Sequence, residues 1–292
     1  MIASRYIIGD GLMDKSSEKC SDKPNILLIM TDQHRADLMT CAGNSTVPTP
    51  NIDRIAKRGV RFTHAYCSSP ICVPSRMSLL TSLYPHTIGV ITNKDFLDWR
   101  YRTIAHHFAE AGYLTALIGK MHFNDAHTHG FEYYLSINDW LAYLGPKVQH
   151  YANEVASHPL TTHFYHTVFD DGAGFPEIIN LWDKGSPWVG HVTRSSFNSM
   201  ASQLNAEDHL DMFIARESVK FMQRYQDQPF FLVSSFMKPH TPLFPPKEWA
   251  DLYPIDEIEL PPVGRIDTYP PHIQQRIKAF NKIDPRLRRA HI

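Results

Sequence analysis

Three short apolar segments stand out along the chain, and polar residues follow each of them directly. The segments are residues 26–30, 113–118 and 230–236. Continuous apolar runs of this length are typical of strands that a parallel sheet buries on both faces. We therefore predict three core strands, each ending in residues that are able to carry chemistry.

Apolar residues at helical spacing separate these segments. Pro and Gly mark the ends of several predicted helices, as their backbone restrictions require. Strands that alternate with helices favour an α/β fold with a mostly parallel sheet flanked by helices. The predicted helices cover residues 51–57, 74–84, 103–111, 207–225 and 272 onward, with Pro85 ending the second.

The remaining segments lack a regular period. Residues 1–23 predict a polar N-terminal arm, and residues 24–292 are expected to form one α/β domain. Within this domain, residues 124–205 are rich in aromatic, His and Gly residues and predict a loop-rich insertion over one end of the sheet. Loops in that position usually carry specificity.

The composition is typical of a soluble globular protein, with 43% hydrophobic and 20% charged residues among 292. The formal net charge of -1 argues against a nucleic-acid partner. No apolar run approaches the roughly 20 residues of a transmembrane helix, so we expect no membrane partner. The N-terminal arm has no secretory pattern, which favours a cytoplasmic location. No pattern predicts an oligomeric state.

The cysteine and histidine contents point to individual side chains rather than to a disulfide framework. Four cysteines are few for this length, whereas 17 histidines are many. Histidine is the usual general acid, general base and metal ligand near neutral pH. The composition therefore favours a hydrolytic or metal site.

The polar residues that follow the three predicted strands are candidates for one shared crevice. Asp32 and Gln33 follow the first strand, Lys120 and His122 the second, and His240 the third. A single Asp, Lys or His in such a place is more often a helix cap or a solvated residue. In open α/β sheets, however, ligands bind outside the carboxyl ends of the strands, and three coincidences favour a common site.

Cys72 lies where a predicted helix begins, four residues before Arg76. The positive end of the helix macrodipole favours anions and lowers the pKa of a thiol, and Arg binds sulfate or phosphate oxygens in a bidentate manner. An isolated Cys in this position is more often a small buried thiol. Cysteine phosphatases place five residues between Cys and Arg, and only three intervene here, so the spacing excludes that class.

Two longer motifs make the sequence resemble a known family. Residues 72–76 have the sequence CVPSR, which matches the C-x-P-S-R signature of type I sulfatases, and residues 112–122, GYLTALIGKMH, resemble their second signature. Residues 24–33, 49–53 and 239–242 also resemble that family. The likeness implies an alkaline-phosphatase-like α/β fold.

This resemblance implies a sulfuric ester hydrolase that uses a formylglycine derived from Cys72. A formylglycine-generating enzyme would be a partner, and the substrate would be a small-molecule sulfate ester. A divalent cation, usually Ca²⁺ with Mg²⁺ or Mn²⁺ as options, would be held by Asp32, Gln33 and position 72. The pair Asp32-Gln33, with Gln33 in place of a second acidic residue, resembles the pattern of the choline-sulfatase and phosphonate monoester hydrolase branch of the alkaline phosphatase superfamily.

The same resemblance implies roles for further residues. Arg76 would orient the formylglycine hydrate, Lys120 would bind and neutralise the sulfate, and His122 would be the base that releases it. His240 would contact the substrate and protonate or stabilise the leaving oxygen, and Asn93 is a candidate substrate contact.

Three alternatives stay open. A phosphonate or phosphate ester hydrolase could use the same residues. His122, His127 and His129 could form a zinc cluster, although a solvated histidine-rich turn without a fourth ligand is the simpler interpretation. The family also takes metal ligands from a downstream Ser-Asp-His-Gly motif, which the sequence does not contain. The chain therefore resembles the N-terminal half to two-thirds of a sulfatase, and a non-catalytic sulfate-binding or metal-binding protein is the third alternative.

Overall fold

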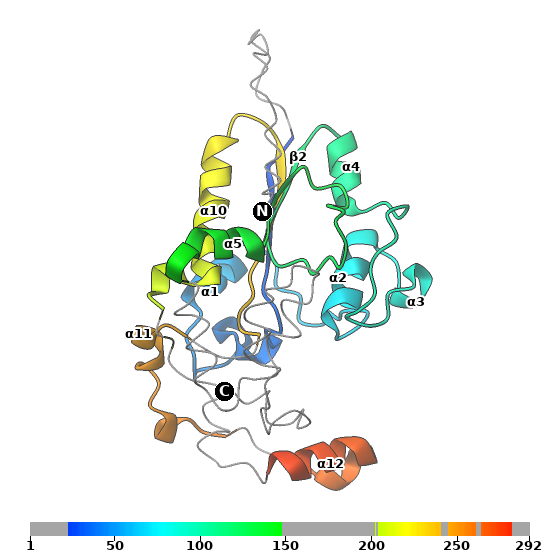
Figure 1. The fold of residues 1–292 in the computed structure, drawn as a ribbon. Helices are drawn as coiled ribbons and strands as arrows, with labels where there is room; N and C mark the ends of the chain where they lie inside the picture. The colour runs from blue at the N-terminus through cyan, green and yellow to red at the C-terminus, as the bar shows by residue number, and fades with distance from the viewer. Residues whose placement is uncertain (1–22, 148–201, 203, 241–244, 261–263, 282–292) are drawn as a thin grey trace, which may run out of the picture.

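A computed structural model describes residues 23–147, 202, 204–240, 245–260 and 264–281. Its centre is a parallel sheet, as predicted (Figure 1). The strands in this part of the chain are β1 (Ile26–Met30), β2 (Leu114–Gly119), β3 (Tyr133–Leu135) and β4 (Phe230–Ser235), and they pair in the order β1-β4-β2-β3.

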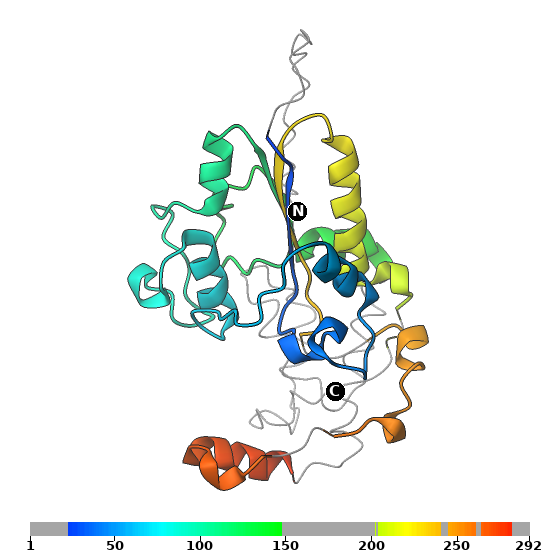
Figure 2. The same ribbon diagram turned by 180° about the vertical axis from the view of Figure 1, so that it is seen from behind.

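Helices cover the two faces of the sheet as separate groups. Figures 1 and 2 show α5 and α10 on one side and α2, α3 and α4 on the other. This arrangement confirms the predicted α/β class. The α-helices of the described residues are α1 (Pro50–Arg58), α2 (Cys72–Thr81), α3 (Pro85–Ile88), α4 (Ile104–Glu110), α5 (Ile137–Leu144), α10 (Leu210–Arg224), α11 (Lys247–Ala250) and α12 (Pro271–Phe280).

Two apolar cores result, because successive side chains of a strand point to opposite faces. On β2, Ile118 packs in the core under α5 and α10, and Leu117 packs in the core under α2 and α4. Leu232 and Val233 divide in the same way on β4. Both strands are buried along most of their length and form the centre of the sheet.

The first strand differs from the prediction, because only one of its faces is buried. Leu27 and Ile29 are 41% and 52% exposed, whereas Leu28 packs against the core under α2 and α4. The physical reason is position: β1 is an edge strand of the sheet, and Ile26, Leu28 and Met30 pack against the core under α2 and α4.

The helix predicted from Pro74 to Pro85 is two helices in the structure. The first, α2, ends at Thr81, and Ser82 then adopts a left-handed conformation with φ 57°. Pro85 is the first residue of α3 instead of a stop signal. Proline suits the first turn of a helix because its missing N–H has no intrahelical acceptor there.

The predicted arm and much of the predicted insertion lie outside the described residues, which omit 1–22 and 148–201. The described part of the insertion contains β3 and α5. Among the described helices, none combines the length and apolar character that crossing a membrane requires.

Candidate active site

Three strands deliver side chains to one edge of the sheet. The register aligns Met30 of β1, Ser235 of β4 and Gly119 of β2. Asp32 and Lys120 follow within two residues, and the Lys120 N–H donates to the Ser235 carbonyl at 2.9 Å. The sequence-predicted strand ends therefore meet, as the parallel arrangement requires.

Gly119 is needed where β2 turns toward Lys120. Its φ is +102°, which a residue with a side chain adopts only under strain, and an added Cβ would lie 2.1 Å from the Ser235 carbonyl oxygen. The Gly-Lys pair of the second motif is thus explained by a close approach between two strands.

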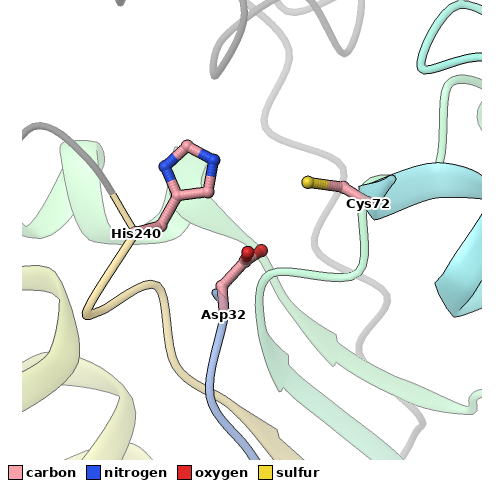
Figure 3. Close-up of side chains that lie close together, drawn as sticks. All are labelled: Asp32, Cys72 and His240. Carbon is pink, nitrogen blue, oxygen red and sulfur yellow. The ribbon is translucent and has the colours of Figure 1, made fainter. Parts of the chain in front are cut away.

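Cys72 is the first residue of α2, and Ile71 before it is extended. Figure 3 shows its sulfur pointing toward Asp32 and His240, and the ligand atoms of these three residues lie within 4.8 Å of one another. Asn93 accepts a hydrogen bond from the Val73 N–H at 3.0 Å and so binds the first turn of α2. A helix N-terminus beside Cys72 favours an anionic ligand.

A buried ion-pair network lies under the sulfur. Arg76 Nη2 contacts Asp32 Oδ2 at 2.9 Å, and Lys120 Nζ contacts the same oxygen at 2.7 Å. Arg76 also donates to the Lys120 carbonyl at 2.5 Å and to Ser235 Oγ at 2.9 Å. Burial raises the pKa of Asp32, but Lys120 and Arg76 outweigh burial and hold this pKa below its ordinary value of 3.8. Asp32 is therefore an ionised, fixed carboxylate.

Lys120 stands between the carboxylate and the sulfur. Its Nζ is 3.9 Å from Cys72 Sγ as well as 2.7 Å from Asp32 Oδ2, and its side chain is buried. An ammonium in this place can neutralise an anion that is bound in front of Cys72.

His122 is a buried neutral imidazole beside this network. Burial, followed by the nearby charges of Lys120 and Arg76, lowers its pKa from 6.5 to about 4. Its Nδ1 is buried, and no described residue gives it a hydrogen-bond partner. A nitrogen in this state can accept a proton from a bound group at neutral pH.

The loop that carries Lys120 and His122 is attached to the loop that carries Asn93. Asn124 Nδ2 donates to the Asn93 carbonyl at 2.8 Å and to the Asp95 carbonyl at 2.6 Å. Sequence reasoning missed Asn124, because its partners lie about thirty residues away and are backbone atoms.

His129 has a structural environment. It is buried, its Nε2 lies 3.1 Å from Asp125 Oδ1, and its carbonyl accepts from Thr103 Oγ1 at 2.6 Å. The interpretation of this segment as a solvated turn is thus wrong for His129, because two side chains hold it inside the fold. In the described ranges, the histidines of the suggested zinc cluster do not converge on one ion position.

Asp211 was also missed. Its Oδ1 accepts hydrogen bonds from the N–H groups of Met237 at 2.7 Å and Lys238 at 3.3 Å, and burial raises its pKa. It thereby fixes the segment that leads from β4 to His240. The sequence signal was an acidic residue near the start of a helix predicted over 207–225, which the macrodipole explains equally well.

The residues present fit a divalent cation in general. Asp32 offers a buried carboxylate, and its ligand atom lies within 4.8 Å of those of Cys72 and His240. Arg76 and Lys120 both contact Asp32 at Oδ2. Gln33 follows in a left-handed conformation with φ 60°, and its side chain is exposed. Its role as a cation ligand stays a prediction.

The sequence is similar to those of known proteins. A 32% identical arylsulfatase of Clostridium perfringens aligns over 246 residues, which are 83% of this chain and 48% of that protein. The choline-sulfatase of Rhizobium meliloti is 32% identical over 263 residues, or 87% and 46% of the two chains. The chain thus spans about half the length of the curated relatives it matches.

A solved structure shares the fold. The phosphonate monoester hydrolase of Silicibacter pomeroyi superposes with a TM-score of 0.63 at 20% identity, covering 92% of this chain and 56% of that one. The sequence profile of the Sulfatase family matches residues 24–269, which include the three strand ends and Cys72. Together with the arrangement of these residues at the carboxyl edge of the sheet, this match shows that the chain belongs to the sulfatase family.

Proposed function

We propose that this protein is a sulfuric ester hydrolase whose nucleophile is formed at Cys72. The observation that carries the proposal is the position of Cys72: its sulfur lies at the N-terminus of α2, 3.9 Å from the Lys120 ammonium and facing a buried, ionised Asp32. Membership of the sulfatase family supports the same activity.

The charges around Cys72 suit a sulfate ester. The ester carries negative charge on oxygen, which the Lys120 ammonium and the positive end of α2 stabilise. Arg76 is engaged with Asp32 and Ser235, so its contribution is to hold Asp32 and Lys120 in place. Lys120 is accordingly the residue that binds the sulfate group.

The proton transfers are assigned to two histidines. The hydrate of formylglycine at position 72 supplies a nucleophilic hydroxyl that attacks sulfur. When its second hydroxyl loses a proton, sulfate leaves and the aldehyde forms again. His122, neutral because burial lowers its pKa to about 4, accepts a proton at sulfate release. His240, on the opposite side of Asp32 from Cys72 in Figure 3, donates a proton to the alcohol that leaves.

A divalent cation completes the proposal, with Ca²⁺ as the first choice. When bound, it polarises the sulfate oxygens and favours the ionised form of the hydrate. Asp32 and Gln33 offer oxygen atoms, which are the ligands that Ca²⁺, Mg²⁺ and Mn²⁺ prefer. Formylglycine at position 72 adds a further oxygen donor.

Two readouts test this proposal separately. After co-expression with a formylglycine-generating enzyme, mass spectrometry of the peptide that contains Cys72 is expected to show the aldehyde. The same preparation is then assayed with para-nitrophenyl sulfate and with para-nitrophenyl phenylphosphonate, and we expect the sulfate to be turned over at least ~10-fold faster.

Each failure has a distinct meaning. A thiol that persists at Cys72 in every co-expressed sample would refute the assigned nucleophile, whatever the turnover. Formylglycine together with faster phosphonate turnover would keep the nucleophile and replace the reaction by that of a phosphonate ester hydrolase.

A further inference from the structure

Three metal-ligating side chains of different chemistry meet at the carboxyl edge of the sheet. They are the Cys72 thiol, the His240 imidazole and the Asp32 carboxylate, and in the described part of the chain this is the one group of three His, Cys, Asp or Glu residues that could hold an ion. Sulfur, nitrogen and oxygen donors in this combination suit Zn²⁺ better than they suit Ca²⁺.

We propose that the chain with an unmodified Cys72 binds Zn²⁺ through Cys72 Sγ, an imidazole nitrogen of His240 and Asp32 Oδ1. This site differs from the oxygen-ligated cation site of the proposed reaction in its donors and in its preferred metal. It requires no modification of Cys72, so it stands independently of the proposed function.

The geometry is close to that of a zinc centre. Bond lengths of roughly 2.0–2.3 Å place tetrahedral ligands about 3.3–3.8 Å apart. The three ligand atoms already lie within 4.8 Å of one another. Side-chain rotations that move these atoms by about 1 Å would bring them to the spacing of zinc ligands. In Figure 3 the Cys72 sulfur and the His240 ring flank the Asp32 carboxylate and come from different segments. Three protein ligands leave the fourth position open.

The charges around the site allow a cation. Arg76 and Lys120 both contact Asp32 Oδ2, so zinc is assigned to Oδ1. Zinc binding releases the thiol proton, and the resulting thiolate offsets one of the two charges of the metal. Lys120 Nζ, 3.9 Å from the sulfur, competes with the metal for these ligands. We therefore expect a Kd of about micromolar size rather than the much tighter binding of a closed zinc site.

A change of metal preference follows from the chemistry of position 72. Conversion of the thiol into an aldehyde hydrate replaces a soft sulfur donor by oxygen, and oxygen donors favour hard cations such as Ca²⁺. The thiol form thus prefers zinc and the converted form prefers calcium. This second step rests on the proposed function, whereas zinc binding by the thiol form does not.

The test uses the 292-residue chain expressed without a formylglycine-generating enzyme and purified reduced and metal-free. Co²⁺ replaces Zn²⁺ as a spectroscopic probe, because thiolate coordination gives a charge-transfer absorption that histidine and carboxylate sites lack. We expect one Co²⁺ per chain with this absorption, its displacement by one equivalent of Zn²⁺, and no displacement by a large excess of Ca²⁺.

Variants decide whether the three assigned residues are the ligands. Cys72→Ser and Cys72→Ala are expected to abolish the charge-transfer absorption, and His240→Ala is expected to weaken Co²⁺ and Zn²⁺ binding at least ~100-fold. Cys41→Ser is the matched control, because Cys41 is a free thiol of similar partial exposure, and it leaves both readouts unchanged.

Three results would overturn the proposal: wild-type chain without the charge-transfer absorption, absorption that persists in both Cys72 variants, or loss of absorption in Cys41→Ser. Far-ultraviolet circular dichroism identifies any variant that fails to fold. In that event, wild-type chain with Cys72 carboxamidomethylated gives the same comparison on a folded protein.

Discussion

At the scale of single residues, Asp32 is the centre of the site. It accepts contacts from Arg76 and Lys120 inside the fold, and its ligand atoms face Cys72 and His240. Buried ion pairs contribute little net stability, because the loss of hydration opposes the attraction, but removal of one partner leaves a buried charge uncompensated. The network is therefore better explained by positioning than by stability.

Arg76→Met tests whether the buried charges of the network depend on one another. We expect it to lower the free energy of unfolding by about 3 kcal/mol, because Asp32 then keeps one of its two cationic partners. Adding Asp32→Asn in the same chain is expected to recover part of that loss. Urea denaturation measures both effects.

The exposed pair Lys247–Asp251 is the control, with a contact of 2.8 Å between two exposed side chains. Lys247→Met is expected to cost less than about 0.5 kcal/mol. If Arg76→Met were as stable as Lys247→Met, the buried contact between Arg76 and Asp32 would not be important for stability, contrary to our prediction.

At the scale of elements, the sequence predicts the strands that are both long and apolar. β1, β2 and β4 are found within a residue or two of their predicted bounds, because burial favours continuous apolar runs. β3 was not predicted, since its three residues are half-buried and carry no recognisable period. Its place is set by pairing with β2, which is a tertiary effect.

The same distinction holds for the site. Asp32, Lys120 and His122 could be predicted because they come within three residues of the ends of apolar strands. The contacts of Asn124 and Asp211 could not, because both side chains bind backbone groups of segments that are remote in sequence. Folding alone brings these partners together, and the residue types Asn and Asp do not indicate them.

Asn124 is expected to act as a link between two loops. Asn124→Ala removes two hydrogen bonds, to the Asn93 and Asp95 carbonyls, and thereby loosens the contact between Asn93 and the Val73 N–H. We predict faster hydrogen exchange at Val73 and in residues 91–96, measured by mass spectrometry of peptides. Exchange in α10 serves as the reference. An equal acceleration there would indicate global destabilisation and would refute a local role.

At the scale of the whole molecule, burial of histidines makes stability depend on pH. Burial is the largest cause in each case, since it disfavours the charged imidazolium, and it lowers the pKa below the ordinary value of 6.5. The unfolded chain therefore binds more protons than the folded chain just below pH 6.5, and the free energy of unfolding falls as the pH falls. The histidines are His106, His122, His129 and His209.

We predict that urea denaturation shows a loss of stability between pH 7 and pH 5, of which His122 accounts for roughly 2 kcal/mol. His122→Asn is expected to flatten this dependence, whereas His64→Asn, at an exposed position, leaves it unchanged. Asp32 affects stability at lower pH. Because its pKa is lowered in the folded chain, its contribution to the free energy of unfolding is lost only as the pH falls below about 3.8. A free energy of unfolding that rises from pH 7 to pH 5 would contradict the lowered pKa values of these histidines.

Position 72, which faces Asp32 and Lys120, is the proposed nucleophile of a sulfate ester hydrolase. The most direct measurement is the initial rate of para-nitrophenyl sulfate hydrolysis per mole of protein, in preparations whose formylglycine content is known. The protein and its Cys72→Ala variant are co-expressed identically with a formylglycine-generating enzyme and assayed with Ca²⁺. We predict a rate proportional to formylglycine content and at least about a thousandfold lower in Cys72→Ala. Equal rates in the two preparations, or a wild-type rate independent of formylglycine content, would contradict the claim.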